Sequence, residues 1–111
     1  PMEVIIEMNG TSYNEVTLST YVFKADWIFG PKKISILTSE DGETYTELAA
    51  QEIKDNGQMT DGNGCQDYTL SFAETSAKFL KVIADTYTEL PEWHPGAGHP
   101  GFIFVDEIIV K

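Results

Sequence analysis

Arginine is absent from this chain, and cations of any kind are few. The 111 residues include seven lysines against 18 acidic residues, which gives a formal net charge of −11 at pH 7. Proteins that bind nucleic acid neutralise phosphates with Lys and Arg, and anionic membrane surfaces attract the same side chains. We therefore expect neither nucleic acid nor a membrane as a partner. The negative charge of the chain has little effect on the binding of an uncharged ligand.

Cysteine and long apolar runs are also scarce. Cys65 is the single cysteine, so an internal disulfide is excluded. No apolar run approaches the roughly 20 residues that a membrane-spanning helix needs. The hydrophobic content of 41% is ordinary for a globular protein. We expect one domain over residues 1–111, and the abrupt, strand-like start indicates a fragment of a longer protein.

The hydrophobic pattern is that of β-strands, because apolar and polar side chains alternate along several short segments. Asp41-Gly42 lies between two of these segments and supplies the positive φ that a tight turn requires. No segment has the pattern of a three-turn helix. The predicted strands are residues 3–8, 15–23, 33–39, 44–49, 67–72, 79–84 and 102–110. Their spacing predicts an all-β, antiparallel sandwich.

Two connections between the predicted strands are long. Residues 54–66 are rich in Gly, Asn and Asp, which is typical of a flexible surface loop. Residues 85–101 contain three prolines, three glycines, Trp93 and both histidines, His94 and His99. Long loops in compact domains are often functional, and prolines with a large aromatic favour an ordered one.

The aromatic side chains are the best candidates for ligand contacts. Tryptophan faces stack on the apolar C–H surface of pyranose rings, and imidazole groups hydrogen-bond sugar hydroxyls. Trp93, His94 and His99 share the long loop, and Trp27 lies between two predicted strands. Trp27 is followed by Ile28, so a packing role is favoured for it. For Trp93, the sequence supports a packing role and a ligand-binding role equally.

Metal binding and catalysis have weaker support in the sequence. Glu92 with His94 and His99 is a loose zinc pattern, for which the non-metal interpretation is favoured. A calcium-like alternation of oxygen ligands is interrupted by a cysteine; it consists of Asp61, Asn63, Cys65 and Asp67. No G-x-S-x-G nucleophile motif occurs, and nothing supports Cys65 paired with a histidine as a nucleophile. We therefore expect a non-catalytic domain.

Several passages together resemble discoidin-like domains, also called coagulation-factor type C domains. They are S-E-D-G-E-T-Y at 39–45, A-K-F-L-K-V-I-A at 77–84 and D-E-I-I-V at 106–110. More narrowly, W-I-F-G-P-K at 27–32 and L-P-E-W-H-P-G-A-G at 90–98 are similar to the C-terminal domain of Bacteroides-type family 20 β-hexosaminidases, or chitobiases. The resemblance runs over nearly the whole chain.

The resemblance implies a galactose-binding-like jelly-roll β-sandwich of about seven or eight antiparallel strands, a group that includes carbohydrate-binding module family 32. It implies a C-terminal accessory domain of a secreted glycoside hydrolase, located outside a bacterial cell, in the periplasm or on the surface. The partner would be a glycan containing N-acetylhexosamine or galactose, bound by end loops. Trp93 and His94 occupy the loop that carries the family's sugar-binding aromatic residue.

Two further expectations follow from the resemblance. Glu107 matches a glutamate that holds a structural calcium ion in many members, although the early loop with most calcium ligands has no counterpart here. The arginine with which several members clamp the sugar is also lacking. Alternatively, the domain packs on the catalytic domain of the same chain without a ligand, through a surface that contains Ala97, Phe102 and Phe104.

Overall fold

The computed structural model describes residues 2–54 and 63–111, and in these ranges the chain forms seven strands and one short 3-10 turn. The elements are β1 (Met2–Glu7), β2 (Tyr13–Val22), η1 (Lys24–Asp26), β3 (Lys33–Ser39), β4 (Thr46–Glu52), β5 (Gly64–Thr75), β6 (Phe79–Asp85) and β7 (Val105–Val110). No helix within these ranges is long and apolar enough to cross a membrane.

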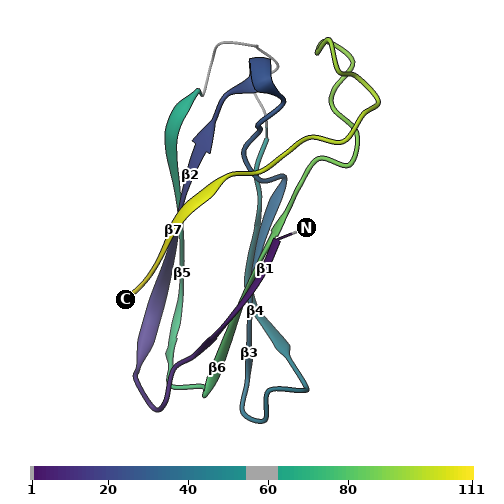
Figure 1. The fold of residues 1–111 in the computed structure, drawn as a ribbon. Helices are drawn as coiled ribbons and strands as arrows, with labels where there is room; N and C mark the ends of the chain where they lie inside the picture. Colours follow the sequence, from purple (N-terminus) through teal and green to yellow (C-terminus); the bar gives the residue numbers. More distant parts are fainter. Residues whose placement is uncertain (1, 55–62) are drawn as a thin grey trace.

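The strands form two antiparallel sheets that face each other. One sheet has the order β1-β6-β3-β4 and the other has the order β5-β2-β7 (Figure 1). Side chains point alternately into and out of this sandwich, as the buried positions Val16, Leu18 and Val22 along β2 illustrate. The predicted all-β sandwich is confirmed.

The last strand begins at Val105 and not at Phe102, where the sequence placed its start. The N–H of Phe102 donates to the carbonyl of Trp27 at 2.8 Å, and the carbonyl of Phe102 accepts from Phe29 at 3.0 Å. These bonds tie Phe102 to the segment after β2. Because each backbone group forms its bonds there, Phe102 cannot join β7 in the ladder with β2.

The core lies between the two sheets. Its buried members are Tyr13, Val16, Leu18, Ile34, Ile36, Leu70, Leu80, Val82 and Ala84. Each fully buried aliphatic side chain contributes about 1.5–3 kcal/mol through loss of contact with water. These members come from β2, β3, β5 and β6.

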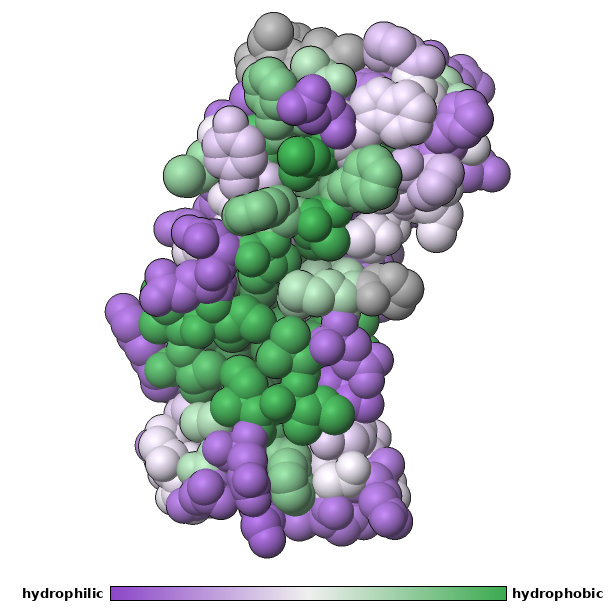
Figure 2. Space-filling view, viewed as in Figure 1, coloured by the Kyte–Doolittle hydropathy of each residue, from purple (hydrophilic) through white to green (hydrophobic). Residues whose placement is uncertain are grey.

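One side of the sandwich leaves part of this core accessible. β1 and β7 are sheet edges, and their inward side chains, such as Ile6 and Ile108, pack on the core while remaining partly exposed. Figure 2 displays an apolar band across the middle of the face on which β1 and β7 lie in Figure 1. Phe102 and Phe104 are 63% and 52% exposed.

The two ends of the sandwich differ. The turn end consists of the short connections 8–12, 40–45 and 76–78. The loop end consists of residues 23–32, 53–54, 63 and 86–104, and lies at the top of Figure 1. The second long connection noted in the sequence, residues 85–101, belongs to the loop end, and so do the described residues 53–54 and 63 that flank the first one. Most of the first one, residues 55–62, lies outside the described residues.

Candidate functional site

The loop end is organised by a tight turn after β2. The N–H of Phe23 donates to the carbonyl of Ile28 at 2.9 Å, and the N–H of Ile28 returns a bond to Phe23 at 3.1 Å. Between them, Trp27 ends η1 in the left-handed region at φ 65°, and its N–H donates to Lys24 at 3.0 Å. A bulky residue in this conformation is uncommon, so its surroundings must hold the turn in place.

His94 supplies much of that support, because its ring bridges the long loop and η1. Its Nε2–H donates to the carbonyl oxygen of Lys24 at 2.6 Å, and its Nδ1 accepts the N–H of Gly96 at 2.9 Å. These two partners require a neutral ring with the proton on Nε2. The side chain is 3% exposed. The sequence suggested an imidazole that faces water, and the structure instead buries it with both nitrogens bonded inside the chain.

The zinc alternative also fails at His94. Both of its ring nitrogens are engaged, so neither offers a lone pair to a metal ion. The described part of the chain holds no group of three or more His, Cys, Asp or Glu side chains that could bind a metal, and Glu92 and His99 are within that part.

Trp27 and His99 pack on each other. Their rings stack with centroids 5.7 Å apart and planes inclined by 28°. Gly96 lies against the indole so closely that a Cβ there would come within 2.7 Å of Trp27 Cε2. Trp27 therefore joins the two segments of the loop end, while His99 stays exposed at their surface.

Trp93 differs from Trp27 because it remains accessible. Its side chain is 38% exposed. Its inner contacts are the rings of Phe29 at 6.0 Å and His94 at 5.9 Å, and the Lys24 ammonium lies 5.5 Å from its ring centroid. Phe29 is 2% exposed and anchors this cluster in the interior. The indole is thus fixed from within and open to solvent on its outer side.

The proposed calcium ligand Glu107 lies on an exposed position of β7, opposite Ser19 of β2. It belongs to no group of three potential ligands among the described residues. Of the calcium-like loop pattern, Asp61 lies outside those residues, and the amide oxygen of Asn63 accepts the N–H of Lys24 at 3.1 Å. Calcium binding remains a prediction.

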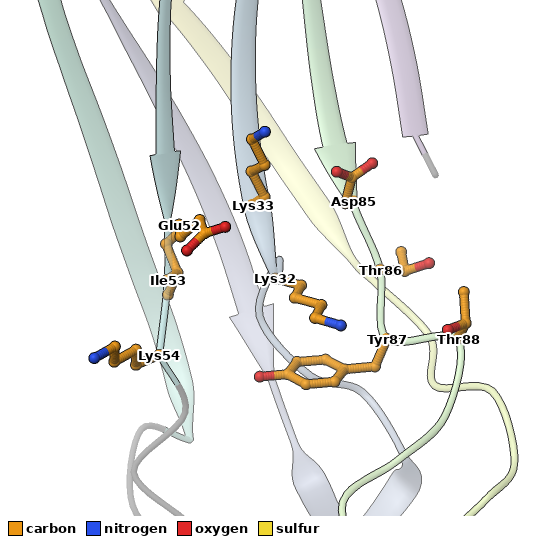
Figure 3. A pocket seen from close by; sticks show the side chains of 9 residues that line it. All are labelled: Lys32, Lys33, Glu52, Ile53, Lys54, Asp85, Thr86, Tyr87 and Thr88. Atoms are coloured by element: carbon orange, nitrogen blue, oxygen red, sulfur yellow. The ribbon is translucent and has the colours of Figure 1, made fainter.

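A groove of about 490 Å³ lies beside the aromatic cluster (Figure 3). Its lining comes from the residues before β3, the end of β4 and the residues after β6; it consists of Lys32, Lys33, Glu52, Ile53, Lys54, Asp85, Thr86, Tyr87 and Thr88. Sequence reasoning missed this groove. The sequence offered one signal, the adjacent Lys32 and Lys33 in a chain poor in cations.

Backbone hydrogen bonds fix the three segments that line the groove. The N–H of Lys32 donates to Asp85 at 2.7 Å, and the carbonyl of Lys32 accepts from Ile53 at 2.9 Å. The carbonyl of Tyr87 accepts from Gly101 at 3.0 Å, and its ring contacts Phe29 at 5.4 Å. The groove wall and the cluster around Trp93 therefore share Phe29 as a common support.

These features define an antiparallel β-sandwich with an ordered, aromatic-rich loop end. No protein-family model matches the sequence, and no curated protein sequence matches it either. Solved structures do match. The CBM32-3 module of a family 31 glycoside hydrolase from Clostridium perfringens superposes with a TM-score of 0.57 at 17% identity, over 97% of this chain and 64% of the solved chain.

Two further solved structures are similar over most of this chain. The CBM32-5 module of CpGH89 from Clostridium perfringens, solved with GalNAc-β-1,3-galactose, gives a TM-score of 0.49 at 19% identity, over 95% of this chain and 65% of its own. The C-terminal domain of a chitobiase from Bacteroides fragilis gives 0.40 at 15% identity, over 100% and 66%. This chain therefore spans less than two thirds of each solved chain.

The predicted likeness to family 32 carbohydrate-binding modules is confirmed as a likeness of structure. At 17% identity, the likeness to CBM32-3 establishes that the chain has the β-sandwich fold of such a module. A fold hosts many functions, so the ligand must be argued from the loop end itself.

Proposed function

We propose that residues 1–111 form a non-catalytic carbohydrate-binding domain of a glycoside hydrolase, and that the loop end binds the glycan. The parent enzyme would be of the β-N-acetylhexosaminidase type, and the protein would be secreted, periplasmic or on the bacterial surface. The ligand would be a glycan that contains N-acetylhexosamine or galactose. The supporting observation is the Trp93 indole, which is 38% exposed at the end of a CBM32-like sandwich.

The chemistry of sugar binding suits this indole. A pyranose ring has an apolar C–H face that gains contact area on an aromatic ring, and the gain is largest when the ring is already held in place. Phe29 and His94 contact Trp93 from within, so little side-chain freedom is lost when a sugar binds. Trp93 is therefore the proposed contact surface.

The other residues predicted for the site receive different parts in this proposal. His94 positions the loop through Lys24 and Gly96, and does not contact the sugar. Trp27 supports the same loop, with Gly96 against its indole. His99 is exposed beside Trp27, where its free ring edge is available to a sugar hydroxyl.

Substitution of Trp93 by Ala tests the proposal. We expect about tenfold weaker retention on immobilised N-acetylgalactosaminyl-galactose, since truncation of a central aromatic contact commonly costs more than about 1 kcal/mol. The melting temperature should change little, because the side chain is partly exposed. Phe104→Ala, which removes an aromatic ring that is 52% exposed, is the matched control and should leave retention unchanged.

Unaltered retention of Trp93→Ala would contradict the proposal. If the Ala variant fails to fold, Trp93→Phe replaces it, which keeps the packing on Phe29 and His94 but reduces the stacking area. Retention of the Phe variant should then lie between that of the native protein and the background. Retention equal to that of the native protein would again count against Trp93.

The apolar band supports a second candidate function, in which the domain packs on the catalytic domain of the same chain and binds no glycan. Contiguous exposed apolar surface commonly marks an interaction site, and Phe102 and Phe104 are more exposed than Trp93. Ala97 is also exposed. Two results together would favour this candidate over the first. The domain would bind no glycan on an array, and it would bind an apolar dye that the variants Phe102→Ser and Phe104→Ser no longer bind.

A further inference from the structure

We propose that the groove in Figure 3 binds the carboxylate of an acidic pyranose, such as a hexuronic acid, with Lys32 as the anion-binding residue and Tyr87 as the apolar wall. This proposal rests on the proposed carbohydrate-binding function and adds a class of ligand to it. The chain's negative charge alone suggests the opposite preference, so the local arrangement has to be argued step by step.

Cations are concentrated at this groove. Three of the chain's seven lysines line it, namely Lys32, Lys33 and Lys54. Two acidic residues, Glu52 and Asp85, also line it, and both are cross-strand partners of Lys33. Such pairs place opposite charges close together, so Lys33 is balanced within the sheet. Lys32 and Lys54 are both exposed and lie just outside β3 and β4, so cross-strand pairing of the kind that balances Lys33 does not reach them.

Lys32 and Tyr87 combine a charge with an apolar surface. In Figure 3 the Lys32 side chain extends toward the Tyr87 ring, whereas Lys54 points away from it. The Lys32 ammonium lies 5.9 Å from the centroid of that ring, within the range of a cation–π contact. An anion bound to this ammonium therefore brings the rest of its molecule close to the phenol ring.

The surroundings suit a sugar ring attached to that anion. Ile53 and Tyr87 are half-buried and provide apolar contact area, while Thr86 and Thr88 provide hydroxyl groups at the rim. The volume of about 490 Å³ falls within the usual range for small-molecule sites. The backbone bonds of Lys32 to Asp85 and Ile53 hold the walls in place before any ligand arrives.

The charge of the whole chain limits the ligand to one or a few negative charges. A net charge of −11 repels a polyanion along its whole length. A single carboxylate responds mainly to charges within a Debye length, about 8–10 Å at physiological salt. The groove should therefore bind a monosaccharide or a chain end with one carboxylate, and not a highly sulfated polymer.

The test compares sugars that differ only at C6. Galacturonic acid and galactose, and glucuronic acid and glucose, are titrated into the ¹⁵N-labelled domain while amide shifts are followed. We expect the acid of at least one pair to bind about threefold to fivefold more tightly than its neutral counterpart, the range of a partly exposed ion pair. Added NaCl should remove the difference, because it screens the charge.

Two variants test whether Lys32 causes the preference for the acidic sugar. Lys32→Gln should abolish the preference for the acid, and it should still fold because the side chain is exposed. Lys78→Gln is the matched control, since Lys78 is also exposed and its ammonium lies 5.8 Å from the Phe79 ring at the turn end. It should leave the preference intact. Equal losses in both variants, or no preference in either sugar pair, would overturn the proposal.

The two proposals can fail separately. Retention on immobilised N-acetylgalactosaminyl-galactose is measured for the same samples. If retention depends on Trp93 but neither acid is preferred, only the groove assignment is wrong. If an acid is preferred through Lys32 but Trp93→Ala changes nothing, the groove is a site and the Trp93 surface is not.

Discussion

The two ends of the sandwich use polar side chains in different ways. At the turn end, the Tyr13 hydroxyl donates to the distant carbonyl of Ala77 at 3.1 Å, but the polar side chains of the connection 40–45 satisfy the backbone of their own segment. The Ser39 hydroxyl accepts the N–H of Gly42 at 2.9 Å, and the Asp41 carboxylate accepts those of Glu43 and Thr44 at 2.8 and 2.9 Å. Every one of these bonds spans at most three residues. The connection 40–45 is therefore held by contacts within itself.

At the loop end, polar side chains join segments far apart in the chain. His94 bonds to Lys24 across 70 residues of sequence, and Asn63 bonds to the same residue across 39. Because these contacts fix the backbone from within, Trp93 and Lys32 can remain exposed without the loops having to move. The difference teaches that the exposed side chains of the loop end are carried by polar contacts between distant segments of the chain.

The largest expected effect comes from removing the contact that joins the loop segments. His94→Ala leaves the Gly96 N–H buried without its partner, removes one of the two donors to the Lys24 carbonyl and creates a cavity beside Phe29. We expect a loss of about 2–4 kcal/mol in the free energy of unfolding. Urea unfolding followed by tryptophan fluorescence measures it.

His99→Ala is the control for that change, since His99 is exposed and only stacks on Trp27. It should cost less than about 1 kcal/mol. A loss for His94→Ala as small as that for His99→Ala would mean that the buried imidazole does not hold the loop end together, and the contrast between the two ends would disappear.

A smaller effect should separate two uses of glycine. Gly96 has no room for a side chain, because an added Cβ would come within 2.7 Å of Trp27 and 3.1 Å of Leu90. Gly10 at the turn end has open space but a φ of +83°. Gly96→Ala should cost about 1–3 kcal/mol through overpacking, and Gly10→Ala about 1 kcal/mol through backbone strain.

The two glycine variants should also differ in their retention on the immobilised glycan. Gly96→Ala should also weaken retention, since the displaced Trp27 and Leu90 carry the loop that presents Trp93, whereas Gly10→Ala should lower stability without any change in retention. Equal retention by both variants, measured well below their melting temperatures, would show that the geometry of residues 90–97 is irrelevant to binding.

The sandwich could be predicted from the sequence because its determinants are local. Alternation located β3 at Lys33–Ser39 without error, and Asp41-Gly42 identified the turn, where Gly42 has a φ of +79°. The alternation of side chains along a strand and the residue preferences of a turn both involve only two to four neighbouring residues, so both can be read from a single sequence. The residue at which a strand begins or ends depends on pairing with distant segments, which is why Phe102 was wrongly placed in a strand.

The sequence located the loop end but did not show which of its side chains face solvent. A proline-rich segment with an indole and two imidazoles indicated a functional loop, but which ring faces water depends on contacts across the chain. His94 is buried among the rings of Trp27 and Phe29 and bonds to the carbonyl of Lys24, 70 residues earlier. The groove was missed for the same reason, since Lys32, Lys54 and Tyr87 meet only after β3, β4 and β6 have paired.

The smallest expected effect lies at the turn end and depends on pH. Hydrogen bonds from the N–H groups of Thr44 and Glu43, and from the Ser39 hydroxyl, lower the pKa of Asp41 from 3.8 to about 2. A carboxyl whose pKa is lower in the folded state than in the unfolded state stabilises the fold above the unfolded pKa. Its contribution is therefore complete above about pH 4 and is lost as the pH falls toward about 2.

Asp41→Asn keeps an oxygen acceptor in the turn but cannot titrate. The midpoint of urea unfolding should therefore fall less between about pH 4 and about pH 2 in this variant than in the native protein. Glu43→Gln removes one carboxylate from the same turn and controls for the change in net charge. If both variants flatten the pH dependence equally, the cause is general charge repulsion in an acidic chain, and the turn end does not hold its own carboxylate as the hydrogen bonds of Asp41 imply.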